Sequence, residues 1–595
     1  MTSLASCGRS PATARSTTIG PQDVVDHLDP QRWAAANRTL VRKAFAEFAH
    51  ERLLIPEPDG DGWAVHSDDG LVVYRFAADR LALDHWHVDG GSITRHRAGI
   101  ALPLDALDLF LELRDTLGLT EEVLPDYLEE ITSTMAGIAF TLADPTPSKE
   151  LARADFQTIE SGMTEGHPCF VADNGRLGLD AAEHRAYAPE AGAPVRLVWL
   201  AVRRDRATFA CSDGVDHDLL VRTELDAATL ARLSAVLHDL GLDLDAYYLL
   251  PVHPWQWWNR IAVTFAGDLA RRDVVCLGEG DDVHLAQHSA RTFLNSTAPQ
   301  RHCVKTALSV LDLGFLRGLP GERRRGTPAI NDWLAELIAG DEVLTRHRFT
   351  LLRERAAIGY HAAQHAAAAP KGSPHTRMLT ALWRESPRPE PGERLATMAS
   401  LLHVDHAGDP LIGELIAESG LEPAAWLNRY LQAYLTPLLH CLYAHRLVFV
   451  PHGANLILVL RDGAPTRVMM NDIGEQIAVL DTEVELPSAV ERIRVEVPDE
   501  LVCLPIHTDV FDRVFRFLAA ILHTNGLLPQ DEFWAVVAAC VADYQRSAPQ
   551  LADRFARHDL FAERFALSCL NRTQLRDGRP TLDAALDNPI ARHRP

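Results

Sequence analysis

Residues 452–475 read His-Gly-Ala-Asn-Leu-Ile-Leu-Val-Leu-Arg-Asp-Gly-Ala-Pro-Thr-Arg-Val-Met-Met-Asn-Asp-Ile-Gly-Glu, and this stretch shapes the interpretation of the whole chain. An apolar run from Leu456 to Leu460 meets the turn signal Arg461-Asp462-Gly463, and a second apolar run ends at Met470. This pattern predicts a β-hairpin.

Polar side chains stand just outside both predicted strands. His452 and Asn455 precede the first strand, and Asp472 follows the second. Antiparallel pairing brings these ends together, so an imidazole, an amide oxygen and a carboxylate should meet at one edge. Amide and carboxylate oxygens suit Mg²⁺ that also holds nucleotide phosphates. A surface hairpin with polar ends explains the same residues equally well.

Length and charge limit the class of protein. A chain of 595 residues exceeds one compact domain, so two to four lobes are expected. The net charge of −23 argues against a nucleic-acid or anionic-membrane partner. No run of about 18 apolar residues exists, so no membrane span is expected.

Nine scattered cysteines without a Cys-x-x-Cys pair indicate reduced thiols in a cytosol. Residues 1–22 lack an apolar core and are expected to form a disordered tail rather than a signal peptide.

Hydrophobic spacing predicts an α+β protein of several lobes. Helical spacing at 31–54 is followed by a strand meander at 62–88 and a return to helix at 104–141. Residues 194–211 and 246–310 are rich in strands, and the chain from Pro328 onward is mostly helical apart from the hairpin. Two charged or histidine-rich segments, 353–355 and 403–406, are expected on helices and are interpreted as structural.

Some nucleotide and hydrolase motifs are absent from the sequence. It contains no Gly-x-x-x-x-Gly-Lys-Ser/Thr loop and no Gly-x-Ser-x-Gly elbow, so neither a P-loop nor a serine hydrolase is supported.

Residues 287–317 offer a candidate anion site. Ser289 and Arg291 precede Lys305, which lies within the apolar strand Cys303–Leu308, and Arg317 follows. A lysine in an apolar strand is costly unless it meets an anion, and arginine forks suit phosphate or carboxylate. On these residues alone, a lysine on the solvated face of a half-buried strand is slightly favoured.

Two loops have the composition of a ligand pocket. Gly166-His167-Pro168 leads to Asn174 and Arg176, and His253-Pro-Trp-Gln256-Trp-Trp-Asn259 surrounds polar groups with three tryptophans. Such aromatic and amide groups suit an extended organic ligand. Clustered tryptophans lie more often at an interface between lobes, so this alternative stays open.

Together these segments resemble the siderophore synthetases that work without a nonribosomal peptide synthetase, the aerobactin-synthetase-like (IucA/IucC) family. The resemblance spans most of the chain and rests on Gly166-His167-Pro168, Val252-His253-Pro254-Trp255-Gln256, Ser289-x-Arg291-Thr292, Lys305, Arg317, His452-Gly453-x-Asn455 and Asp472. Long segments are most similar to the branch that oligomerises and macrocyclises hydroxamate monomers into desferrioxamine-type siderophores.

The resemblance implies a cupped-hand fold with three lobes after the tail: a thumb at 23–160, strand-rich fingers at 161–335 and a mostly helical palm at 336–595. It also implies that ATP and Mg²⁺ activate a carboxylate of an N-hydroxy-N-acyl diamine, such as N-hydroxy-N-succinylcadaverine, as an acyl-adenylate. An amine then forms the amide. A cytoplasmic homodimer is implied as well.

The resemblance also assigns roles to residues. Lys305, Arg317, His452 and His167 are implied to be catalytic, and Asn455 and Asp472 to hold the metal. The implied nucleotide-binding residues are Ser289, Arg291, Lys305, Arg317, His452, Asn455 and Asp472. The implied substrate-binding residues are His167, Asn174, Arg176, His253 and Gln256.

Two positions depart from the family pattern. Ala454 stands where Gln or Glu is usual, and Asn471 stands where Arg or Lys is usual. These departures keep open a nucleotide-binding protein that has lost catalysis. A small-molecule phosphotransferase is a further alternative, but such kinases place an aspartate directly after His-Gly, where this chain has Ala454.

Overall fold

The computed structural model describes residues 20–163, 165–312, 315–316, 326–370, 373–451, 453–480, 484–575 and 584–595. Residues 1–19 of the predicted tail and the predicted site residues Arg317 and His452 lie outside this described part.

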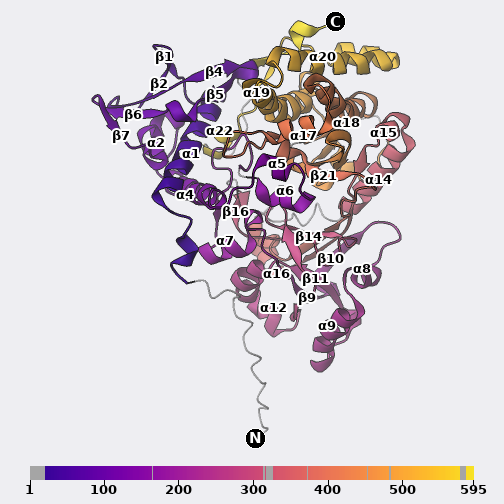
Figure 1. Ribbon diagram of the computed structural model, residues 1–595. Helices are drawn as coiled ribbons and strands as arrows, with labels where there is room; N and C mark the ends of the chain where they lie inside the picture. The colour runs from indigo at the N-terminus through magenta and orange to yellow at the C-terminus, as the bar shows by residue number, and fades with distance from the viewer. Residues whose placement is uncertain are drawn as a thin grey trace.

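The fold is α+β, as the sequence predicts, and its apolar side chains gather into three large cores. In Figure 1 the indigo and purple N-terminal elements lie at the upper left, the magenta middle elements lie at the bottom, and the orange C-terminal helices lie at the upper right.

The first core lies between α1 (Pro30–His50) and a five-stranded antiparallel sheet of order β1-β2-β3-β6-β7. The side chain of Asp29 accepts the backbone N–H groups of Gln31 and Arg32 and so caps α1. The other elements before residue 163 are β1 (Glu57–Asp59), β2 (Gly62–His66), β3 (Val72–Phe76), β4 (Ala78–Leu81), β5 (His85–Val88), β6 (Thr94–Arg97), β7 (Ile100–Leu102), α2 (Ala106–Glu112), α3 (Arg114–Leu117) and α4 (Leu124–Thr141), together with α5 (Ser148–Leu151) and α6 (Phe156–Gly162), which contribute Leu151 and Ile159 to the third core described below.

The second core joins a three-stranded sheet, β11-β9-β12, to a six-stranded sheet of order β10-β19-β20-β15-β14-β13. The strands are β9 (Val198–Arg203), β10 (Ala207–Cys211), β11 (Tyr247–Val252), β12 (Val274–Glu279), β13 (His284–Ala286), β14 (Thr292–Asn295), β15 (Cys303–Thr306), β19 (Glu354–Tyr360) and β20 (Thr380–Arg384). Because β19 and β20 lie beyond residue 335, this sheet draws strands from both sides of the lobe boundary expected there.

Shorter elements surround these two sheets. A small three-stranded sheet of order β17-β16-β8 contacts α4 through β8. The elements are α7 (Ala181–Tyr187), α8 (His217–Glu224), α9 (Ala227–Asp239), α10 (Pro254–Gln256), the π-helix η7 (Trp257–Ile261), α11 (Ala262–Thr264), α12 (Ala266–Ala270), α16 (Ala363–Ala368), β8 (Arg176–Leu177), β16 (Leu311–Asp312) and β17 (Phe315–Leu316).

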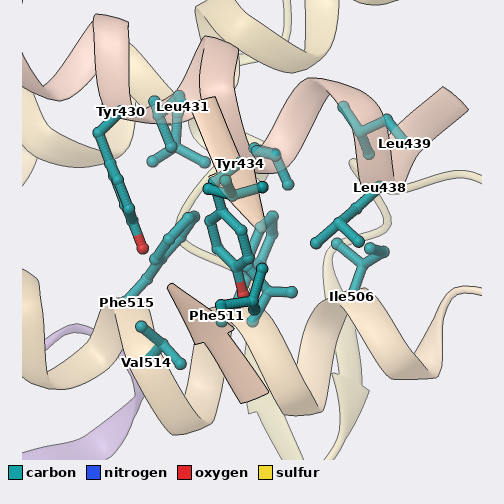
Figure 2. Packing of buried hydrophobic residues seen from close by; sticks show 14 of the residues in the cluster. Tyr430, Leu431, Tyr434, Leu438, Leu439, Ile506, Phe511, Val514 and Phe515 are labelled. Atoms are coloured by element: carbon teal, nitrogen blue, oxygen red, sulfur yellow. The ribbon is translucent and has the colours of Figure 1, made fainter. Parts of the chain in front are cut away.

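The third core is mostly helical and contains the hairpin, which the structure confirms as β23 (Leu456–Arg461) and β24 (Ala464–Met470). Figure 2 shows Tyr430, Tyr434 and Leu438 of α18 (Pro423–His445) packed near Phe511 and Phe515 of the π-helix η14 (Pro505–Phe515).

The other elements of the C-terminal part are α14 (Thr327–Gly340), α15 (Glu342–Arg346), β18 (Thr350–Leu351), β21 (Arg394–Thr397), α17 (Leu411–Ser419), β22 (Leu447–Phe449), β25 (Ile477–Val479), α19 (Arg516–Thr524), α20 (Gln530–Ser547), α21 (Ala552–Arg557), β26 (Arg564–Ala566), α22 (Leu570–Leu575) and β27 (Ala585–Asp587).

Two local expectations are wrong. Residues 353–355 do not form a helix, because Glu354 begins strand β19, which pairs with β20 and β10. Residues 403–406 follow the 3-10 helix η9 (Met398–Leu402) and are not helical. In both segments, tertiary contacts that local charge spacing does not report determine the backbone.

Other sequence predictions can be compared directly with the described residues. The eight cysteines among them are free thiols. Within the same residues, no helix combines the length and the hydropathy that crossing a bilayer requires.

A buried ion network joins the first and last parts of the chain. The guanidinium of Arg516 on α19 lies 2.8 Å from Glu47 on α1 and 3.1 Å from Asp512 on η14. These three side chains are at most 4% exposed. The pairing therefore compensates buried charges at the contact between two lobes.

We predict that Arg516→Ala lowers the free energy of unfolding by roughly 3–5 kcal/mol, because it leaves two buried carboxylates without their shared cation. Urea unfolding followed by circular dichroism measures the change. Arg546→Ala, which removes an exposed ion pair with Asp543, serves as the control and should cost less than about 1 kcal/mol. Equal losses in the two variants would contradict this account of the network.

Candidate active site

Lys305 is buried, so the solvated-face interpretation of this lysine is wrong. Its strand, β15, pairs with β14 on one side and β20 on the other, and its side chain is 5% exposed. The ammonium Nζ lies 2.8 Å from Oδ2 of Asp472, which follows the hairpin. The buried lysine therefore meets an anion, as its position in an apolar strand requires.

Arg384 is a second cation on the same carboxylate, and it was not found from the sequence. It ends strand β20, and its Nη1 lies 3.2 Å from Oδ1 of Asp472. Its Nη2 donates to Oε1 of Gln287 at 2.9 Å. The run Thr380-Ala-Leu-Trp-Arg384 carries a related signal, a cation at the end of an apolar strand.

The environment of Asp472 strongly favours its charged form. Burial opposes the carboxylate, but Lys305 and Arg384 outweigh that effect and hold the pKa of Asp472 well below its usual value of 3.8. Arg291, which is 7% exposed, contributes to the same lowering. Two buried cations thus contact one carboxylate and a third adds to their field, and arginine and lysine donors of this kind suit a phosphate or carboxylate group.

Two residues at this site adopt the left-handed conformation without being glycine. Asp472 has φ +56°, and Ala290, between Ser289 and Arg291, also has φ +56°. Such backbone costs of order 1–3 kcal/mol and persists where surrounding contacts enforce it. At these two positions it lies directly beside the cationic cluster.

The predicted meeting of the hairpin ends is confirmed for Asn455 and Asp472. Leu456 pairs with Met470, and the backbone N–H of Asn471 donates to the carbonyl of Asn455 at 3.0 Å. The side chain of Asn455 donates to the carbonyl of Val450 at 3.2 Å and also to Gln476. This network holds the start of one strand beside the end of the other.

Gly453 is required by close packing at this edge. A Cβ at this position would lie 2.9 Å from Cα of Ala399. The loop that begins the hairpin therefore approaches a neighbouring backbone more closely than any other residue type allows.

A cavity of about 1040 Å³ connects these residues with the N-terminal lobe. The predicted site residues on its wall are His167, Asn174, Arg176, Ser289, Arg291, Lys305, Asn455 and Asp472. Ala454 and Asn471, the two departures from the family pattern, line it as well. The sequence therefore predicts residues that the fold brings together from segments hundreds of positions apart.

His253 and Gln256 are not on the wall of this cavity. His253 is buried, and its Nδ1 accepts the N–H of Trp255 at 3.0 Å. Gln256 is also buried: its amide donates to the carbonyl of Met378 and accepts from the N–H of Ser309. Here both side chains order the backbone after β11, and their substrate-binding role stays a prediction.

The end of the cavity formed by the N-terminal lobe has a different charge pattern. Lys43 on α1 lies 2.6 Å from Asp173, and Arg42 lies 2.9 Å from Glu165. The carboxylate of Asp173 also accepts the N–H of Gly166 at 3.0 Å. These pairs order the loop that carries His167, and the sequence pattern gave no sign that α1 supplies their cations.

The chemistry of the wall is therefore divided. One end offers arginine and lysine donors to an anion, together with amide and carboxylate oxygens suited to Mg²⁺. Asp472 fits such an ion, because each carboxylate oxygen keeps a second acceptor position beyond its ion pair. The other end carries the Lys43–Asp173 and Arg42–Glu165 ion pairs and the imidazole of His167.

Comparisons with known proteins find two family models and several curated relatives. Residues 155–403 match the IucA / IucC family, and residues 424–582 match the family described as ferric iron reductase FhuF-like transporter. Putrebactin synthase from Shewanella sp. (strain MR-4) is 46% identical over 96% of this chain and 93% of its own. Aerobactin synthase from Escherichia coli is 29% identical over 93% of this chain and 94% of its own.

A solved structure shows the same fold. The aerobactin synthetase IucC of Klebsiella pneumoniae matches with a TM-score of 0.85 and 28% identity, covering 95% of this chain and 99% of its own.

We predict that Asp472→Asn destabilises the protein in a pH-dependent way. Because the folded pKa of Asp472 is lowered, its contribution is fully present above the unfolded value of 3.8 and is lost as pH falls through the folded pKa. The difference in unfolding free energy between wild type and variant should therefore be constant above about pH 5 and shrink below about pH 4. Urea titrations across this range measure it.

Asp462→Asn, in the exposed turn at the other end of the same hairpin, is the control variant. A wild-type advantage over Asp472→Asn that stays unchanged down to pH 3 would contradict the ion-pair assignment.

Proposed function

The chain belongs to the IucA/IucC family, and on that premise we propose that it is an ATP-dependent siderophore synthetase that activates a carboxylate as an acyl-adenylate and joins it to an amine. The observation that carries the proposal is the Lys305–Asp472–Arg384 cluster, with Arg291 beside it, on the wall of a large cavity.

The cationic end is proposed to bind the triphosphate. In the first step a carboxylate oxygen of the substrate attacks the α-phosphorus, the bond to the bridging oxygen breaks, and pyrophosphate leaves. Negative charge builds on the phosphate oxygens, and fixed cations in a buried site stabilise it without reorganising. Arg291, Lys305 and Arg384 are positioned for this task, and the hydroxyl of Ser289 is held by Thr292 at 2.9 Å.

Asp472 and Asn455 are proposed to hold Mg²⁺ when the nucleotide is bound. Mg²⁺ would supply charge neutralisation on the phosphates and commonly needs only one or two protein carboxylates. Ala454 offers no ligand, so water and phosphate oxygens would complete the coordination. Asp472 also accepts hydrogen bonds from Lys305 and Arg384, and these contacts exist without a bound metal ion.

The opposite end is proposed to receive the amine. In the second step the amine nitrogen attacks the acyl carbonyl, AMP leaves, and the nitrogen loses a proton. Glu165 lies on this wall in an ion pair with Arg42, so an incoming amine would meet a paired carboxylate rather than a free one. His167 is the proposed acid–base group, because it lines the cavity on a loop ordered by the Lys43–Asp173 pair.

The proposed substrate class is an N-hydroxy-N-acyl diamine with a free carboxylate at the other end, such as N-hydroxy-N-succinylcadaverine. A molecule that carries both an amine and a carboxylate can be joined to copies of itself, so oligomers and macrocycles of the desferrioxamine type follow. Similarity to a putrebactin synthase over nearly the whole chain supports a siderophore product.

The product analysis is the first test of this function. With ATP, Mg²⁺ and N-hydroxy-N-succinylcadaverine, we expect AMP and pyrophosphate in equal amounts, together with amide-linked oligomers seen by mass spectrometry. Formation of ADP and phosphate would instead identify a phosphotransferase. ATP binding without any nucleotide product, across a panel of diamine chain lengths, would identify a non-catalytic relative.

We predict that Lys305→Ala lowers kcat/KM for amide formation roughly 100-fold, which corresponds to about 2.7 kcal/mol of transition-state stabilisation. Arg384 remains paired with Asp472 in this variant, so the fold should persist. Lys149→Ala, at an exposed helix position, is the control. Steady-state pyrophosphate release measures the rates, and an unchanged kcat/KM in Lys305→Ala would refute the assignment.

A further inference from the structure

Asp341, His440 and His445 form a compact group that the proposed reaction does not use. Oδ2 of Asp341 lies 2.9 Å from Nε2 of His440 and 2.8 Å from Nε2 of His445. The three ligand-type atoms all lie within 4.8 Å of one another. Among the described residues, no other set of three His, Cys, Asp or Glu side chains comes this close.

Local structure directs these three atoms at one point. Asp341 caps α15, and its Oδ1 accepts the backbone N–H groups of Val343 and Leu344, so the other oxygen is turned to the histidines. His440 and His445 both lie in the last two turns of α18. The C-terminal end of a helix carries partial negative charge, which also favours a cation there.

Neighbouring groups orient the imidazole of His440. Its Nδ1 lies 3.1 Å from the hydroxyl of Tyr544 on α20, so Nε2 is the nitrogen that faces Asp341. Metal-binding histidines almost always have such a partner on the other ring nitrogen. The Tyr544 contact therefore supplies the kind of partner that such a histidine needs.

The ligand set and its access fit a particular class of cation. Two imidazoles and one carboxylate match the three-ligand sites of Zn²⁺ and related first-row metals and do not match Mg²⁺ or Ca²⁺. Ligands about 2.1 Å from a tetrahedral ion are separated by about 3.4 Å, so a small outward movement of the side chains would admit the ion. His445 is 26% exposed, which leaves a side open to water as the fourth ligand.

We propose that Asp341, His440 and His445 bind one Zn²⁺-class divalent cation that fixes the end of α18 against α15. This proposed metal site is connected to the cavity wall through the chain that follows His445. After His445 the chain continues into β22, which pairs with β25, and then reaches Val450 on the cavity wall. The ion would therefore hold one end of the segment that leads into the hairpin loop (α15, α18 and α20 in Figure 1).

The test measures retained metal and stability on the full-length protein. After dialysis against a chelator, the wild type is loaded with Zn²⁺ in buffer containing excess Mg²⁺, desalted and analysed for metal content. We expect one retained Zn²⁺ per chain and an increase in Tm on loading, because an ion that binds only the folded state stabilises it.

Asp341→Asn is the most informative variant, because asparagine also caps helices but lacks the carboxylate ligand. It and His445→Ala should lose the retained equivalent and the Tm increase. Tyr544→Phe should weaken Zn²⁺ affinity roughly 10-fold or more by removing the partner of His440. His238→Ala, an exposed histidine elsewhere, should behave as wild type.

Two results would overturn the proposal. One is a wild type that retains no Zn²⁺, and the other is an Asp341→Asn variant that keeps the same stoichiometry and Tm increase. If His445→Ala unfolds, the Asp341→Asn and Tyr544→Phe measurements still decide the question.

Discussion

The carboxylate of Asp472 is the point at which the main parts of the site are joined. Buried ions must be compensated, and this one residue pairs with Lys305 from β15 and Arg384 from β20. These two ion pairs thereby link the end of the hairpin to the six-stranded sheet that contains β15 and β20. Because Lys305 and Arg384 compensate the buried carboxylate, the site is stable without a ligand.

The end of the cavity that the N-terminal lobe forms depends on a contact between lobes. Arg516 and Glu47 pair across the boundary between the C-terminal helices and α1, and α1 also carries Lys43, which orders the His167 loop through Asp173. One helix therefore serves both the assembly of the lobes and the shape of the site. This arrangement explains why polar side chains are tolerated in the buried face of α1.

The helical C-terminal core packs against the hairpin. Aromatic and aliphatic side chains of α18 pack against η14, as Figure 2 shows, and Trp426 of α18 donates to the carbonyl of Gly463 in the hairpin turn. The group formed by Asp341, His440 and His445 lies at the far end of the same helix. The N-terminal end of α18 thus contacts the hairpin turn, and its C-terminal end leads into β22, the strand that precedes the hairpin.

The sequence by itself determined the α+β class, the hairpin, the meeting of Asn455 and Asp472, and eight of the residues on the cavity wall, because these depend on local periodicity, turn chemistry and recognisable motifs. Tertiary structure alone revealed Arg384, Lys43 and the burial of Lys305, since each depends on which strand or helix lies opposite. It also placed β19 and β20 in the sheet of the preceding lobe and kept His253 and Gln256 away from the cavity. The physical reason is that spacing along a chain specifies the face of an element, whereas charge compensation and burial depend on the neighbour that the fold brings against that face.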